Sequence, residues 1–157
     1  MKLNTVLMVA FISFLANFST HAQEVKIPTE IIATCGASEG YSYFHQLSGM
    51  KSSDSGFGKD KISNGQFIVT NKGKEYNLLY RSAGKKLQTV EEDGGLVLPI
   101  FASKTTLGLL VIYPDAGVSE TYNFQNLGTE NAGVSWTHTK SVFPIAKSAV
   151  YFAKCEK

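Results

Sequence analysis

Large apolar side chains recur at every second position along much of this chain, in short segments that are separated by turn-forming residues. Tyr76, Leu78 and Tyr80 share one face of such a segment. A period of two indicates a half-buried strand, because successive strand side chains point to opposite faces. The clearest predicted strands are 66–70, 75–81, 96–102, 106–113, 118–125, 133–139 and 148–155.

Turn chemistry separates these segments, and no segment has the pattern of a long amphipathic helix. Asn71-Lys72-Gly73, Glu92-Asp93-Gly94-Gly95 and Pro114-Asp115-Ala116-Gly117 favour tight turns. We therefore predict an all-β, mainly antiparallel fold, either a single meander barrel or a two-layer sandwich of seven to eight short strands. The side chains expected in or near the core are Leu78, Leu109, Val111, Phe124, Trp136 and Phe152.

The first third of the sequence has a less regular pattern. The β-branched run in Glu30–Thr34 predicts a strand, and Tyr41–His45 is a second short candidate. From Ser48 to Gly65 the chain is rich in Ser, Gly, Lys and Asp, which predicts a surface loop that carries Phe57.

The first 22 residues have the pattern of a secretory signal. Lys2 precedes an apolar run, and Thr20-His21-Ala22 is a suitable cleavage site. We expect residues 1–22 to be a signal peptide and 23–157 to form a single β domain that is periplasmic or secreted. No membrane anchor is expected after cleavage. The formal charge of +2 falls to +1 when Lys2 is removed, so nucleic acid is not the expected partner.

The chain contains two cysteines, Cys35 and Cys155. In an exported protein the surroundings are oxidising, so the pair predicts one disulfide; two free buried thiols are the alternative. In the chain-entropy model a bond that closes a loop of this length contributes up to about 5 kcal/mol.

The stretch that follows Cys35 matches the G-x-S-x-G pattern of the nucleophile elbow, with Ser38 as the nucleophile. Asp93 or Asp115 with His138 would complete a triad. The residues after Gly40 are poor for the helix that an elbow requires. We therefore expect a tight structural turn beside the disulfide, in which Gly36 and Gly40 let the chain pass close to a neighbouring segment.

Other site chemistry is sparse in the predicted mature chain. Its two histidines, His45 and His138, lack metal-ligand spacing, so we expect neither a metal nor a cofactor. Aromatic residues occur both in sheet cores and at recognition surfaces. The binding candidates are Tyr41, Tyr43, Trp136 and His138.

The residues Cys35-Gly36-Ala37-Ser38-Glu39-Gly40-Tyr41-Ser42-Tyr43 resemble a motif in a group of small exported bacterial proteins without assigned function. Later segments are similar to the same group, and the likeness covers most of the expected mature chain. The resemblance implies an exported bacterial protein and supplies no activity. The later segments are Glu92–Gly95, Tyr113-Pro114, Glu120–Phe124 and Tyr151–Cys155.

The expected size, fold and cysteine positions also resemble the small periplasmic lysozyme inhibitors. Their Ser-Gly-x-x-Tyr loop is not matched, because Arg81-Ser82-Ala83-Gly84-Lys85 lacks the tyrosine. From the sequence we expect a non-enzymatic binding or protective protein of the cell envelope, whose partner is another envelope or extracellular protein. The alternatives are a small serine hydrolase that uses Ser38 and a lysozyme-inhibitor-like protein. The oligomeric state stays open.

Overall fold

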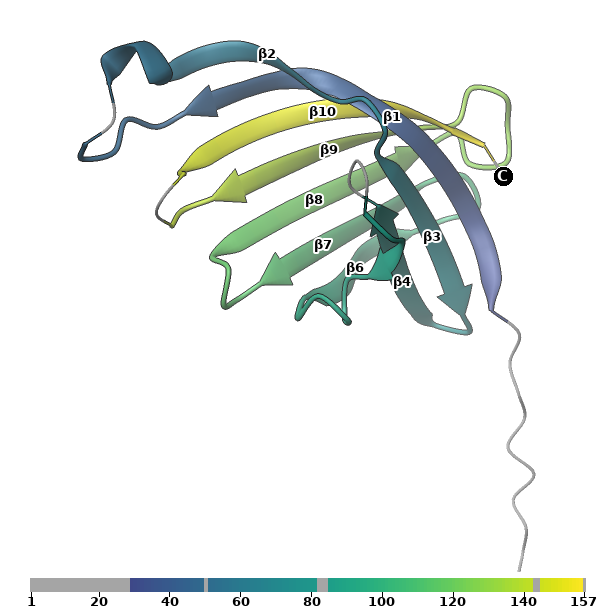
Figure 1. Ribbon diagram of the computed structural model, residues 1–157. Helices are drawn as coiled ribbons and strands as arrows, with labels where there is room; N and C mark the ends of the chain where they lie inside the picture. Colours follow the sequence, from purple (N-terminus) through teal and green to yellow (C-terminus); the bar gives the residue numbers. More distant parts are fainter. Residues whose placement is uncertain (1–28, 50, 82–84, 143–144, 157) are drawn as a thin grey trace, which may run out of the picture.

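The computed structural model describes residues 29–49, 51–81, 85–142 and 145–156, which form one antiparallel sheet that curls into a half-barrel (Figure 1). The expected signal peptide, 1–22, lies outside these residues. The predicted all-β, antiparallel architecture is confirmed. Within the described ranges, no helix is long and apolar enough to span a lipid bilayer.

The sheet contains ten strands rather than seven to eight, together with one short 3-10 helix, η1 (Ser52–Asp54). The strands are β1 (Glu30–Phe44), β2 (Gly56–Ile62), β3 (Gln66–Lys72), β4 (Glu75–Arg81), β5 (Gln88–Thr89), β6 (Leu96–Ala102), β7 (Leu107–Tyr113), β8 (Val118–Gln125), β9 (Gly133–Lys140) and β10 (Lys147–Glu156).

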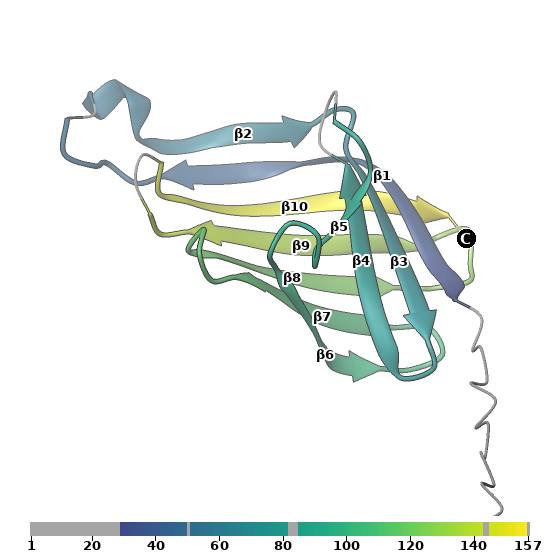
Figure 2. The same cartoon turned by 60° about the horizontal axis from the view of Figure 1, so that its bottom comes forward.

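β1 connects the two parts of the sheet, whose strand order is β5-β4-β3-β1-β10-β9-β8-β7-β6. Its first half pairs with β3 and its second half with β2, while β10 lies along its other side. Figure 2 shows β3 and β4 running at a steep angle to β7–β10. β4 also contacts β6, so the curled sheet comes close to closing on itself.

The predicted loop from Ser48 to Gly65 is wrong, because most of it is β2 and η1. The sequence of β2 lacks the alternation of apolar and polar residues that is typical of a strand, because polar residues lie on both of its faces. Lys59 and Lys61 alternate with Gly58 and Asp60, so no apolar period of two is present.

The core lies on the concave face. Leu78, Leu109, Val111 and Phe124 are fully buried there and Trp136 almost so, as predicted. Phe152 was expected in the core but is 52% exposed. In β10 the buried positions are Ala149, Tyr151, Ala153 and Cys155, and strand alternation places Phe152 on the opposite face.

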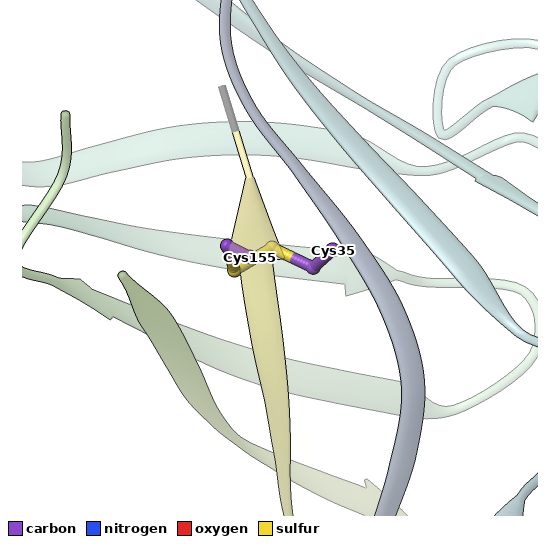
Figure 3. The surroundings of a disulfide bond; sticks show 2 residues. All are labelled: Cys35 and Cys155. Carbon is purple, nitrogen blue, oxygen red and sulfur yellow. A yellow bond between two sulfur atoms is a disulfide. The ribbon is translucent and has the colours of Figure 1, made fainter. Parts of the chain in front are cut away.

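The predicted disulfide is confirmed. Cys35 of β1 and Cys155 of β10 are directly opposite in the register of the two strands, and their side chains are bonded (Figure 3). The register shifts immediately after Cys35, and pairing resumes at Ser38 with Ala153. Gly36 and Ala37 therefore form a bulge in β1.

The tight turn expected at Gly36 and Gly40 is wrong, because both glycines lie within the continuous strand β1. Neither has a positive φ. Gly40 is instead required by a close approach. A Cβ atom there would lie 1.9 Å from the carbonyl oxygen of Val150 in β10, whereas one at Gly36 would have no atom within 4 Å.

We predict opposite results for alanine at these two glycines. Gly40→Ala should lower the free energy of unfolding by about 2 kcal/mol or more, because β1 and β10 would have to separate. Gly36→Ala is the matched control and should leave it unchanged or raise it by up to about 1 kcal/mol. Urea denaturation followed by tryptophan fluorescence measures both. Equal losses in the two variants would contradict this assignment.

Candidate functional site

A row of aromatic side chains crosses the concave face. Tyr122 of β8 is paired with Trp136 of β9, and Trp136 is paired with Tyr151 of β10. The rings of Trp136 and Tyr122 stack with centroids 5.5 Å apart, and those of Trp136 and Tyr151 with centroids 4.5 Å apart. Because these rings cover one another's faces, mainly their edges remain to line the concave surface.

A charged cluster continues this row onto the neighbouring strands. The carboxylate of Asp60 accepts hydrogen bonds from Lys147 at 2.5 Å, from Tyr151 at 2.6 Å and from Ser42. Lys147 also donates to the Tyr151 hydroxyl at 2.6 Å. The position between Tyr151 and Asp60 in the register is Gly40, whose lack of a side chain leaves the space for this contact.

The electrostatics of this cluster favour charged Asp60. Burial alone would raise the pKa of the Asp60 carboxyl, but the hydrogen bonds from Lys147, Ser42 and Tyr151 outweigh it and hold the pKa well below its usual value. The pKa of Tyr151 is raised by burial and by its hydrogen bond to Asp60, so the phenol keeps its proton and donates.

A second cluster surrounds Glu120 of β8. The Tyr122 hydroxyl donates to one carboxylate oxygen at 2.7 Å, and His138 Nδ1 lies 2.7 Å from the other. Burial and then the charge of Glu120 raise the pKa of Tyr122, which keeps this donor protonated. A third pair repeats the pattern, since the Tyr80 hydroxyl donates to Asp93.

These clusters border a cleft of about 430 Å³ on the concave face. Phe67, Trp136 and Val118 contribute apolar surface, and Arg81 and His138 are among the polar residues that line it. The Trp136 indole N–H is buried and has no acceptor among the described residues. The lining of the cleft therefore combines apolar side chains with charged groups, several of which are held by hydrogen bonds to neighbouring side chains.

The four predicted binding residues divide between two faces of the sheet. Trp136 and His138 lie together in the concave cleft, as their shared strand face indicated. Tyr41 points to the convex face and is 55% exposed, and Tyr43 packs edge-on against Phe57 with centroids 4.8 Å apart. The sequence therefore identified parts of two separate surfaces.

Ser38 does not lie in an elbow. It is in the extended strand β1, paired with Ala153 on one side and Ile62 on the other, and it is 3% exposed. Its hydroxyl has no hydrogen-bond partner among the described residues. His138, the base that the alternative serine hydrolase would require, pairs with Glu120 rather than with Asp93 or Asp115.

The convex face carries an apolar patch on three adjacent strands. Phe57 of β2 is 85% exposed, and Val150 and Phe152 of β10 are about half exposed, beside Tyr41 of β1. We call these four residues the outer aromatic patch. Leu96, Leu98 and Ile100 of β6 form a separate apolar strip at the other edge of the sheet.

Sequence reasoning missed Asp60 and Lys147. Asp60 was hidden because its segment was predicted to be a loop, and no local pattern connects it with Lys147, 87 positions away. Glu120 could have been found, because strand alternation places it on the same face as Tyr122. Among the described residues, no group of three or more His, Cys, Asp or Glu side chains could hold a metal ion.

Comparisons of the chain with protein-family models, with curated proteins and with solved structures give no match. The resemblance of Cys35–Tyr43 to exported bacterial proteins therefore stays a prediction.

The lowered pKa of Asp60 predicts acid sensitivity. A carboxyl whose pKa is lower in the folded than in the unfolded state contributes stability above the unfolded pKa, about 4, and loses it as the pH falls through the folded value. Asp60→Asn should lower the free energy of unfolding at pH 7 by about 1–3 kcal/mol and weaken its decline below pH 4.

Urea denaturation at a series of pH values measures this effect. Asp54→Asn is the control, because exposed Asp54 accepts a side-chain hydrogen bond from its neighbour Ser53 and lies outside the Asp60 cluster. If Asp60→Asn kept the wild-type decline below pH 4, the cluster would not be the source of the acid sensitivity.

Proposed function

We propose that this is an exported, non-enzymatic protein that binds another protein of the cell envelope through the outer aromatic patch. The observation that carries the proposal is the 85% exposure of Phe57, whose ring contacts Tyr43, on the same face of the sheet as three further large side chains that are each about half exposed. Exposed aromatic clusters are typical of protein interfaces, where the rings bury much area for little loss of conformational entropy.

The edge strand under this patch supports the same proposal. Among the described strands, β2 pairs with β1 alone, so one edge of its backbone is open to a further strand. A bound segment could pair with that edge while its side chains contact Phe57, Lys59 and Lys61. The exposed lysines also protect a free edge against indiscriminate pairing.

Export itself rests on the sequence of residues 1–22. The Cys35–Cys155 disulfide gives weak support, because such bonds persist mainly in oxidising compartments. Lysozyme is one partner to test, since a lysozyme-inhibitor-like role is the alternative binding function. Within Arg81–Lys85, the segment that lacks the tyrosine of the inhibitor loop, residues 82–84 lie outside the described residues.

The non-enzymatic part of the proposal predicts an inert Ser38. A fluorophosphonate probe, which reacts with activated serine hydroxyls, should not label the protein, because Ser38 is buried and has no base bonded to it among the described residues. Mass spectrometry after incubation, with a known serine hydrolase as positive control, measures the outcome. Labelling that disappears in Ser38→Ala would establish the hydrolase instead.

The proposed protein interface predicts that binding of the partner requires Phe57. Purified tagged protein and its Phe57→Ser variant are compared as baits for an envelope extract and for purified lysozyme. A specific partner should be retained by the wild type and weakened about tenfold or more by Phe57→Ser, since a central interface aromatic contributes about 2 kcal/mol.

The matched control is Leu98→Ser on β6, which removes an exposed apolar side chain from the other edge of the sheet. It should leave binding unchanged. Equal loss in both variants would indicate non-specific adhesion, and loss with Leu98→Ser alone would place the interface on β6.

A further inference from the structure

We infer that the concave cleft is a second binding site, separate from the outer aromatic patch, and that it holds a small apolar molecule by its carboxylate group on Arg81. Arg81 ends β4 and lines the cleft. It is also the chain's single arginine. The inference goes beyond the proposed function, because the cleft and the patch lie on opposite faces of the sheet.

The distribution of charge partners singles out Arg81. Lys147 is paired with Asp60, and His138 with Glu120. Asp93 accepts a hydrogen bond from Tyr80. Among the described residues, Arg81 alone of the charged side chains that line the cleft has neither a hydrogen-bond nor an ion-pair partner. Its charge is therefore available to a ligand.

The guanidinium group specifies the chemistry of the ligand head. It offers N–H donors in a planar fork that matches the two oxygens of a carboxylate. Glu120 and Asp93 also line the cleft, but each already accepts a hydrogen bond from a tyrosine, and neither can donate to a ligand. The unpaired donors of Arg81 therefore fit a carboxylate.

The walls of the cleft specify the body of the ligand. Ile62, Phe67, Val118 and Trp136 line it from β2, β3, β8 and β9. Binding pockets commonly combine such apolar walls with a few fixed polar groups that orient the ligand. About 430 Å³ suits one short alkyl chain or a single ring.

Octanoate is a suitable probe, with octanol as the uncharged control of equal chain length. Trp136 is the chain's single tryptophan and lines the cleft, so its fluorescence reports occupancy. Calorimetry provides a second measure that does not depend on the fluorophore. We expect saturable binding of octanoate and at least tenfold weaker binding of octanol.

Variants of the full chain test the role of Arg81. Arg81→Gln should weaken octanoate binding about tenfold to a hundredfold, the usual loss of a charge-assisted hydrogen bond, and leave octanol unaffected. Arg81→Lys keeps the charge without the fork and should lie between. Lys74→Gln, in the exposed turn at the other end of β4, is the matched control and should change neither affinity.

Three results would overturn the inference: no saturable octanoate binding to folded protein, equal affinity for octanol, or unchanged octanoate affinity in Arg81→Gln. Phe57→Ser should bind octanoate like the wild type. Failure of the cleft site and failure of the protein interface are therefore distinguishable. Circular dichroism confirms that each variant is folded before its affinity is compared.

Discussion

The pairing of β1 with three other strands is the constraint on which the rest of the structure depends. Over 15 residues this strand connects β2–β5 to β6–β10. The bulge at Gly36-Ala37 marks the point where its partner changes from β3 to β2. Gly40 then lets the backbone of β10 approach so closely that a Cβ atom there would lie 1.9 Å from the carbonyl oxygen of Val150.

A repeated pairing of tyrosine with carboxylate makes that concave face both polar and ordered. Tyr151 donates to Asp60, Tyr122 to Glu120, and Tyr80 to Asp93. Each phenol keeps its aromatic ring in or near the core while its hydroxyl satisfies a charge at the border of the cleft. Arg81 differs from these carboxylates, because its guanidinium group has no partner among the described residues.

The sequence predicted the parts of this structure that follow from strand alternation. The shared face of Trp136 and His138 and the buried Leu109 and Val111 are of this kind. The disulfide follows instead from the presence of two cysteines in a chain that is expected to be exported. Alternation applied to β10 would also have placed Phe152 outside. Asp60 could not be found, because its strand has no apolar face and its partners come from β1 and β10. Gly40 was identified as important for the wrong reason, since a contact between strands distant in sequence leaves no local signal.

The bond between Cys35 and Cys155 also determines how the chain carries mechanical load. The described residues begin at 29 and end at 156, so the two cysteines lie close to both ends of the sheet. A force that pulls the two ends of the chain apart passes from Cys35 directly to Cys155 through a covalent link. The 119 residues between the cysteines, which include the outer aromatic patch and the residues that line the concave cleft, stay outside the path of that tension.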